Sequence, residues 1–550
     1  MKVTDAVAAA LTELGADTVF GVVGSGNFHV TNALIARGAR YVAARHECGA
    51  ASMADAWARL AGRPGVLSLH QGPGITNALT GITEAAKSRT PLVVLAADVS
   101  ASAVTSNFRI DVAAIAAATG ATPARLHSPG FAVDDAARAY RLARDERRTV
   151  VLALPLDVQA SECTWPGTPD PHPAAPRPAG PGLAGELAGV LARAARPVFI
   201  AGRGARSAAA RTALERLADA CGALLATSAA AKGLFRGNPF DLDVSGGFAS
   251  PLAAELISGA DVVVGWGCSL NMWTTRHGSL IGPDTTVAQV DLDARAMGAH
   301  RPVRPGVVGD VALVATAVAD LLGDHLLGSH GTGYRSAELR ERLAAGIRWR
   351  DVPYEDASDA ERIDPRSLTI ALDDMLPDER IVAVDSGNFM GYPSMFLSVP
   401  DQDGFCFTQA YQSIGLGLAS AIGSAIARPD RLVVAALGDG GALMGISELE
   451  TAVRLALPMV IVVYDDQAYG AEVHHFGPGG YPLDTVRFPA ADLAAIARGF
   501  GCDAVTVRSV ADLEPVREWL GSRPPRPILI DARVTSERGA WWLEEAFRGH

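Results

Sequence analysis

Short apolar runs alternate with alanine-rich stretches of helical length along the whole chain. The runs include "PLVVLAAD" at residues 91–98, "DVVVGWG" at 261–267 and "LVVAALGDG" at 432–440. A run that is apolar throughout is typical of a strand buried on both faces of a parallel sheet. The alternation therefore predicts an α/β protein with doubly wound parallel sheets, in which ligands bind outside the carboxyl ends of the strands.

Two interruptions of this pattern divide the chain. Residues 164–182, "TWPGTPDPHPAAPRPAGPG", contain too much proline and glycine for a helix or strand, and a weaker boundary lies in the polar stretch 323–362. A chain of 550 residues is also too long for one hydrophobic core. We therefore predict three doubly wound α/β domains, at residues 1–165, 183–325 and 360–550.

Composition narrows the function classes. The net charge of -12 argues against a nucleic-acid partner, because phosphate binding needs a basic face. No uncharged apolar run reaches the roughly 18 residues of a membrane helix, and the amino-terminal residues lack the regions of a signal peptide. The six cysteines are scattered without metal-ligand spacing. We expect a cytoplasmic protein with no membrane contact.

Two apolar runs end in carboxylates. The run "IVVY" leads directly into Asp465 and Asp466, and the preceding run ends at Asp439 within Gly-Asp-Gly-Gly. Glycines at a helix start let backbone N–H groups approach a phosphate closely. Because neighbouring parallel strands end at the same edge of a sheet, Asp439 and Asp466 would face one ligand. With a backbone carbonyl, two phosphate oxygens and a water they would complete an octahedron around Mg²⁺.

These motifs resemble the thiamine-diphosphate signature of the pyruvate decarboxylase and acetolactate synthase superfamily, of which the acetolactate synthase-like branch is the most similar. The resemblance implies Mg²⁺ bound by Asp439, Asp466 and the Ala468 carbonyl. Asp466 stands where the family usually has an asparagine, so the site is one charge more negative. The diphosphate would lie against Gly440, Gly441, Tyr469 and Gly470.

Further motifs extend the resemblance over nearly the whole chain. "ARHECGAASMADAWAR" matches the family segment whose glutamate, here Glu47, hydrogen-bonds the thiamine pyrimidine. "QAYQSIGLG" implies a Gln412 carbonyl for the amino group and an Ile414 side chain beneath the thiamine, and "VDSGNFMG" implies Gly387 and Asn388 at the diphosphate. The implied domains are pyrimidine-binding, central Rossmann-like and diphosphate-binding. In this family each site lies between two chains, which implies a homodimer or homotetramer.

Substrate-pocket residues are less well determined. His70 in "LHQGPG" and Glu472 in "YGAEVHHF" are candidate catalytic residues by resemblance to benzoylformate, pyruvate and indolepyruvate decarboxylases, although His70 could instead be a strand-end histidine bonded to backbone. Arg109 could bind a substrate carboxylate bidentately or form a surface ion pair. The candidate pocket residues are Ser25, His29, Gln71, Arg109, Ala471 and His474.

The resemblance predicts decarboxylation of a 2-oxo acid followed by carboligation of the enamine to a second carbonyl compound, an aldehyde or another oxo acid. The alternatives are a non-oxidative decarboxylase of the benzoylformate type, a 2-hydroxyacyl-CoA lyase, and a non-catalytic paralogue or partner subunit. FAD is not expected, because "PVFIAGRGARSAAA" has Gly202 and Gly204 without the third glycine of a dinucleotide fingerprint.

Overall fold

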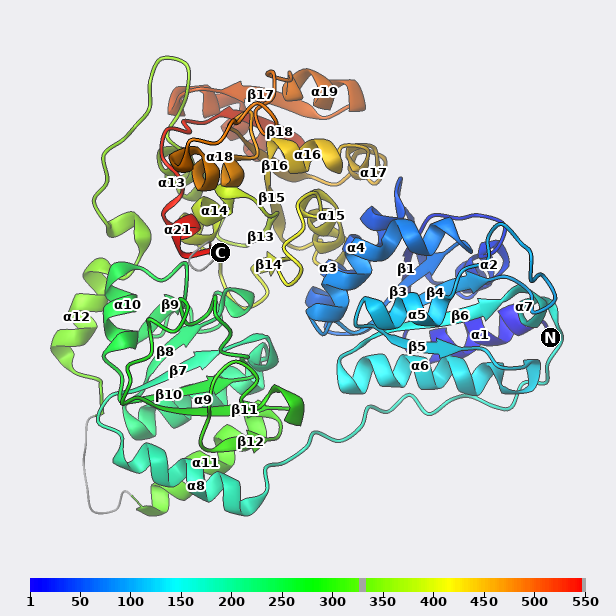
Figure 1. Cartoon of the computed structure of the whole chain (residues 1–550), viewed down its shortest axis with the longest axis horizontal. Coiled ribbons are helices and arrows are strands. Elements are labelled where there is room, and N and C mark those ends of the chain that lie inside the picture. Colours follow the sequence, from blue (N-terminus) through cyan, green and yellow to red (C-terminus); the bar gives the residue numbers. More distant parts are fainter. Residues whose placement is uncertain (326–332, 547–550) are drawn as a thin grey trace.

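The computed structural model describes residues 1–325 and 333–546, and it contains three separate six-stranded sheets, each fully parallel (Figure 1). The predicted fold class, three doubly wound α/β domains, is confirmed. Residues 326–332, within the predicted second boundary, and 547–550, at the end of the third predicted domain, lie outside the described residues.

The amino-terminal sheet has the strand order β2-β1-β3-β4-β6-β5. Its strands are β1 (Thr18–Gly21), β2 (Arg40–Ala43), β3 (Gly65–Leu69), β4 (Leu92–Asp98), β5 (Thr122–Arg125) and β6 (Thr149–Pro155). Its helices are α1 (Val3–Glu13), α2 (Phe28–Ala36), α3 (Glu47–Ala61), α4 (Pro73–Lys87), α5 (Val112–Ala118), α6 (Ala132–Glu146) and α7 (Leu156–Ala160).

The carboxyl-terminal sheet repeats this topology, with the order β14-β13-β15-β16-β18-β17. Its strands are β13 (Arg380–Val384), β14 (Phe405–Phe407), β15 (Leu432–Gly438), β16 (Met459–Asp465), β17 (Asp503–Val507) and β18 (Ile528–Arg533). Its helices are α13 (Pro365–Met375), α14 (Gly391–Phe396), α15 (Gly417–Ala427), α16 (Asp439–Met444), α17 (Glu448–Arg454), α18 (Gly470–Phe476), α19 (Leu493–Phe500), α20 (Glu514–Ser522) and α21 (Trp541–Ala546).

The central sheet has the order β12-β11-β10-β7-β8-β9, which is the arrangement of a Rossmann domain. Its strands are β7 (Pro197–Ala201), β8 (Leu224–Thr227), β9 (Asp241–Val244), β10 (Val262–Trp266), β11 (Thr286–Asp291) and β12 (Gly306–Val308). Its helices are α8 (Pro181–Arg193), α9 (Ala208–Cys221), α10 (Pro251–Ser258) and α11 (Val311–His325), and α12 (Ala337–Gly346) follows.

The amino- and carboxyl-terminal domains share one core. Buried apolar residues of α3 and α4 form a continuous cluster with those of α15 and α17, and the two long helices α3 and α15 lie side by side (Figure 1). The contact is close because Gly423 has no side chain: a Cβ there would lie 2.2 Å from the Met53 carbonyl oxygen. The proline-rich segment 164–180 runs in extended form from the first domain to the central one.

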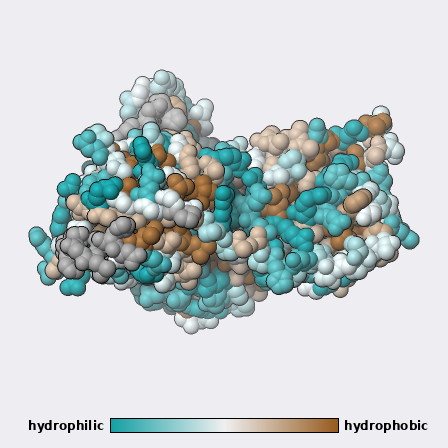
Figure 2. Space-filling model, turned by 90° about the horizontal axis from the view of Figure 1, so that it is seen from below, coloured by the Kyte–Doolittle hydropathy of each residue, from teal (hydrophilic) through white to brown (hydrophobic). Residues whose placement is uncertain are grey.

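Apolar side chains lie in small patches among hydrophilic ones on the face seen in Figure 2, and the surface recedes between the amino-terminal domain on the right and the other domains. No helix in residues 1–325 and 333–546 is both long and apolar enough to cross a membrane.

Candidate functional site

A cavity of about 2130 Å³ lies where the three domains meet. One end is formed by the carboxyl edge of the third sheet, and the other extends between the amino-terminal and central domains. All of the cofactor and metal residues predicted in the third domain line it, together with Ala471 and Glu472: Gly387, Asn388, Gln412, Ile414, Asp439, Gly440, Gly441, Asp466, Ala468, Tyr469 and Gly470.

Asp439 and Asp466 form the acidic part of this edge. Asp439 begins α16 directly after β15, and Asp466 follows the last residue of the adjacent strand β16. Burial and then the charge of Asp466 raise the pKa of Asp439 to about 8, and burial raises the pKa of Asp466 to about 7. In the described part of the chain, no lysine, arginine or histidine forms an ion pair with either carboxylate. The pair therefore has the electrostatic character of a cation site.

Asp465 has a different partner. Its Oδ2 lies 2.6 Å from Nη1 of Arg533, and its Oδ1 accepts a hydrogen bond from the backbone N–H of Gln467. The neighbouring carboxylate of Asp466 accepts from the N–H of Ala468 and is hydrogen-bonded by the Asn388 side chain. Of two adjacent carboxylates, one is neutralised within the protein and one faces the cavity.

The residues present fit a diphosphate and a magnesium ion. A Cβ on Gly440 would lie 2.6 Å from the Tyr469 ring, and one on Gly441 would lie 2.4 Å from Asp385 Oδ2. Any other residue would clash at either position, so the start of α16 needs these two glycines. Among the described residues, no group of three or more His, Cys, Asp or Glu side chains could hold a metal. Two carboxylates and the Ala468 carbonyl would thus share Mg²⁺ with non-protein oxygens, as expected when a phosphate supplies ligands.

Asp385 connects two parts of the cofactor edge. This carboxylate, fully buried after β13, accepts hydrogen bonds from the N–H groups of Ser386, Gly415 and Leu416. Burial raises the pKa of Asp385 to about 6, although these hydrogen bonds favour the ionised form and partly lower it. The turn that carries Gly387 is thereby fixed to the loop that carries Gln412 and Ile414.

An aromatic wall closes the side of the cavity next to Asn388. Trp542 of α21 is buried, and its Nε1–H donates to the Asn388 carbonyl at 2.9 Å. Its ring packs edge-on against Trp273, which follows β10, and both side chains line the cavity. The carboxyl-terminal tryptophan therefore covers the predicted diphosphate site.

A second cluster lies at the carboxyl edge of the amino-terminal sheet. Glu47 begins α3, and its Oε2 accepts from the Asn77 side chain at 3.1 Å. His70 follows β3, and its Nδ1 accepts from the Gly26 N–H at 3.1 Å, which leaves Nε2 to carry the proton of the neutral ring. Burial lowers the pKa of His70, opposed by the charge of Glu47. The histidine is therefore both bonded to backbone and placed near Glu47.

The remaining pocket candidates divide between exposed and buried positions. Ser25, His29 and Arg109 are exposed near the His70 loop, where Phe108 packs edge-on against the imidazole. Gln71 is buried directly beneath Gly26. His474 packs against Gly539, and burial lowers its pKa. Of these five candidates, none is among the residues that line the cavity.

Within one chain the two clusters do not line the same cavity. The start of α3 lies against Glu448, while Arg59 near its end donates to the Phe407 carbonyl beside the Gln412 loop. Twelve residues of helix, about 18 Å, separate Glu47 from Arg59. Glu47 and His70 do not line the cavity that contains Asp439 and Asp466.

Three residues were missed by sequence reasoning. Asp385 ends the apolar run "IVAV", which is the signal already used for Asp465. Asn77 lies on the first turns of α4 after His70, and its reach to Glu47 depends on tertiary structure. Gln409 lines the cavity with both side-chain polar atoms buried and without partners, which has no sequence signal.

The partial dinucleotide fingerprint has a packing explanation. A Cβ on Gly202 would lie 2.4 Å from the Gly267 carbonyl oxygen, and one on Gly204 would lie 2.7 Å from the Gly267 Cα. Both glycines allow the loops after β7 and β10 to touch, and this contact requires no nucleotide.

Comparison with known proteins shows the family of the chain. Three domains of thiamine pyrophosphate enzymes match: the N-terminal TPP binding domain at residues 1–118, the central domain at 184–318 and the C-terminal TPP binding domain at 385–532.

Relatives extend over most of the chain. A probable 2-ketoarginine decarboxylase from Pseudomonas aeruginosa is 30% identical, covering 93% of this chain and 89% of its own. A sulfoacetaldehyde acetyltransferase from Castellaniella defragrans is 26% identical (94% and 90%), and an acetolactate synthase large subunit from Parasynechococcus marenigrum is 27% identical (96% and 86%). The predicted resemblance is confirmed, and the chain belongs to the thiamine pyrophosphate enzymes, which form and cleave C–C bonds.

Proposed function

We propose that this enzyme uses thiamine diphosphate with Mg²⁺ to decarboxylate a 2-oxo acid and to join the remaining acyl unit to a second carbonyl compound. The observation that carries the proposal is the pair Asp439 and Asp466, two half-buried carboxylates that form no ion pair with a cationic side chain in residues 1–325 and 333–546, beside an open glycine helix start. When bound, thiamine supplies a nucleophilic carbon that attacks the oxo group and accepts the electrons of the C–C bond to carbon dioxide.

The residues of the chain would bind and orient the groups. Asp439, Asp466 and the Ala468 carbonyl would hold the metal, and Gly387, Asn388, Gly440, Gly441, Tyr469 and Gly470 would surround the diphosphate. The Gln412 carbonyl and Ile414 would contact the thiamine, and Glu47 would exchange a proton with its pyrimidine nitrogen. His70 and Glu472 would contact substrate, with Ala471 leaving room for a larger one.

A second copy of the chain would complete each site. Glu47 does not line the cavity of its own chain, and both regions carry exposed apolar side chains. Phe28 and Phe108 lie on the Glu47 face, 51% and 41% exposed, and Met444 and Phe488 lie beside the metal carboxylates, 57% and 42% exposed. We therefore propose a homodimer or a homotetramer. A cytoplasmic location stays a prediction.

A simple decarboxylase is the second candidate. Glu472 lines the cavity, where the family resemblance places an acid in decarboxylases, and a relative carries the name 2-ketoarginine decarboxylase. Protonation in place of ligation would release an aldehyde. A 2-hydroxyacyl-CoA lyase is a third possibility that no observation here favours.

The experiment is a product analysis by proton NMR. Purified protein is mixed with Mg²⁺, thiamine diphosphate and pyruvate, with and without an added aldehyde. Acetolactate or a mixed acyloin would support carboligation, and acetaldehyde alone would support the decarboxylase. If pyruvate is not consumed, the hypothesis of an acetolactate synthase activity is wrong, and larger or acidic 2-oxo acids are tested next.

A further inference from the structure

Glu84 on α4 contacts the loop that carries predicted cofactor residues. This side chain is 1% exposed, and its carboxylate accepts hydrogen bonds from the backbone N–H groups of Ala410, at 3.2 Å, and Tyr411, at 2.7 Å. The donors belong to the third domain, and Glu84 belongs to the first. Gln412 follows Tyr411 directly, and Ile414 lies two residues further on.

This loop needs external support. Between β14 and α15 it has no regular secondary structure, and Gln412 adopts φ +59°, which is unfavourable for a residue with a side chain. A strained residue keeps its conformation only when its surroundings fix it. Glu84 fixes the residue before Gln412, and Asp385 fixes Gly415 after it.

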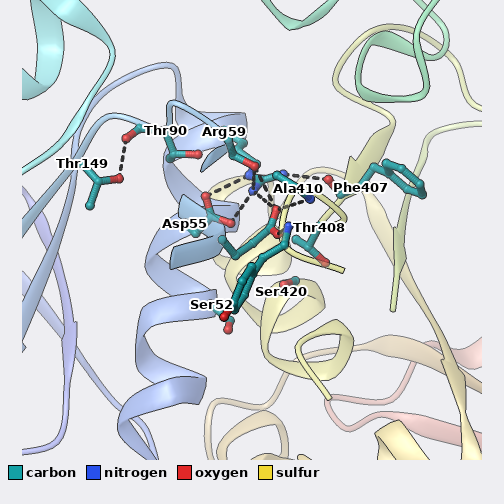
Figure 3. Close-up of polar contacts among 12 residues, drawn as sticks. Ser52, Asp55, Arg59, Thr90, Thr149, Phe407, Thr408, Ala410 and Ser420 are labelled. Carbon is teal, nitrogen blue, oxygen red and sulfur yellow. Dashed lines mark hydrogen bonds and ion pairs between the residues drawn. The ribbon is translucent and has the colours of Figure 1, made fainter. Parts of the chain in front are cut away.

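Arg59 holds the Glu84 carboxylate in place. Its buried guanidinium donates to Asp55, at 2.6 Å, and to the Phe407 carbonyl (Figure 3). It also donates to Glu84, at 2.9 Å, and to the Ser88 hydroxyl. Burial pushes the pKa of Glu84 upward, but the charge of Arg59 outweighs it and the pKa lies below its usual value. The carboxylate is thus an ionised acceptor for the loop.

The central domain reaches the same junction through Arg203, whose guanidinium donates to the Ser88 carbonyl. Ser88 therefore accepts from an arginine of its own domain and from one of the central domain, and its hydroxyl donates to Glu84.

The third domain has a matching contact to the first. Glu448 on α17 is 2% exposed, and its Oε1 accepts from the N–H groups of Arg45, at 3.1 Å, and His46, at 3.0 Å. His46 directly precedes Glu47. The Thr451 hydroxyl donates to the other oxygen of Glu448 at 2.7 Å. A Cβ on Gly49 would lie 2.4 Å from Oε1, so the approach depends on glycine.

We propose that Glu84 and Glu448 are positioning residues for the cofactor: Glu84 sets the Gln412–Ile414 loop and Glu448 sets the start of the helix that carries Glu47. Each carboxylate acts across a domain boundary on the backbone next to a cofactor-facing residue. The proposal rests on thiamine diphosphate binding, which the family establishes, and not on the proposed carboligation.

The test of the Glu84 contact compares Glu84→Gln with Asp55→Asn. Both variants remove one carboxylate from Arg59, but only Glu84→Gln weakens the hydrogen bonds to the loop. We expect Glu84→Gln to speed amide hydrogen exchange in residues 408–416 of the protein without cofactor. We also expect it to raise the calorimetric Kd for thiamine diphosphate, with Mg²⁺ present, about tenfold or more, since bonds to charged acceptors are strong. Asp55→Asn should change neither value by more than about threefold.

The test of the Glu448 contact compares Glu448→Gln with Glu450→Gln. Glu450 lies two residues away on the same helix and pairs with the Arg45 side chain at 2.6 Å, but it does not bind the backbone before Glu47. We expect Glu448→Gln to slow deuterium exchange at the thiazolium C2 of bound cofactor about tenfold, because Glu47 is displaced. Glu450→Gln should keep the wild-type rate. This exchange needs no substrate, so the result is independent of which reaction the enzyme catalyses.

Equal effects in each pair would overturn the proposal, because they would mean that charge balance or general stability, and not the backbone contact, matters. Wild-type binding and exchange in Glu84→Gln and Glu448→Gln would overturn it as well. If Glu84→Gln does not fold, Glu84→Asp takes its place. That variant keeps the charge beside Arg59 but is one methylene too short to reach the loop, so the same loss of loop protection and affinity is expected.

Discussion

Asp465 and Arg533 form an ion pair with 2.6 Å between Oδ2 and Nη1, at the point where strands β16 and β18 lie in register. Arg533 also donates to Asp531 at 2.8 Å, so one guanidinium serves two buried carboxylates. The two neighbouring aspartates therefore have different surroundings. Asp465 is paired with Arg533 within the sheet, and Asp466 faces the cavity.

Replacement of Asp466 by Ala should weaken Mg²⁺ binding in the presence of thiamine diphosphate by about tenfold or more, because a charged oxygen ligand is lost. Asp466→Asn should bind the metal with intermediate affinity, since it keeps an oxygen but not the charge. Isothermal titration calorimetry gives both values. Equal affinity of all three proteins would show that Asp466 is not a ligand.

Replacement of Asp465 by Asn should instead destabilise the fold. The substitution removes the charged acceptor of one Arg533 hydrogen bond and leaves that guanidinium paired with Asp531 alone, which should cost about 2 kcal/mol. Urea unfolding of the cofactor-free protein measures this loss. Asp466→Asn is the matched control and should cost less, because among the described residues Asp466 forms no ion pair that the substitution would break.

The metal-free protein should lose stability as the pH rises. The pKa of Asp439 is raised to about 8 in the folded protein, against about 3.9 in an unfolded chain, so the protonated folded form is favoured at low pH. This contribution is fully present below about pH 4 and is lost progressively up to about pH 8. Thermal unfolding of metal-free wild type should therefore show a steeper decline over this range than Asp439→Asn, which cannot titrate.

Magnesium should reverse that trend, because its binding requires the carboxylates to lose their protons. With thiamine diphosphate and Mg²⁺ present, the gain in Tm should be larger at pH 8 than at pH 6. An equal gain at both values would contradict the assignment of Asp439 as a ligand.

Two inactive variants should complement each other. If Glu47 acts on the cofactor of a partner chain, a mixed dimer of Glu47→Gln and Asp439→Asn contains one intact site and one doubly altered site. Dissociation and reassociation of an equal mixture should recover about a quarter of the wild-type sites, since half of the dimers are mixed. Turnover that stays at the level of the separate variants would place Glu47 and Asp439 in the same chain's site.

Cofactor binding should be visible in the fluorescence of Trp542. This side chain lines the cavity and donates to the Asn388 carbonyl, so a ligand there changes its surroundings. Trp542→Phe should reduce the fluorescence change on titration with thiamine diphosphate and Mg²⁺. Trp519→Phe is the control, because Trp519 is buried in α20 and does not line the cavity. An unaltered response in Trp542→Phe would contradict this placement.

Much of the fold was determined by local sequence pattern. Runs such as residues 432–438 are apolar throughout, which is typical of a parallel strand covered on both faces. Prolines without N–H groups keep residues 164–180 out of helix and strand, but the predicted segment ran to residue 182 and was too long, because α8 begins at Pro181 and proline is tolerated in the first turn of a helix. The Gly-Asp-Gly-Gly turn and Asp466 predicted where the cofactor binds, since ligands bind where parallel strands end.

Tertiary structure alone decided which of these residues meet. The sequence pointed to Asp466 as a metal ligand but did not show what neutralises Asp465, and only the register of β16 with β18 assigns Arg533 to that carboxylate. Glu84 and Glu448 gave no signal, because their function depends on backbone amides more than 320 and 400 residues away. Contacts between distant segments depend on how domains pack, and local periodicity carries no information about that packing.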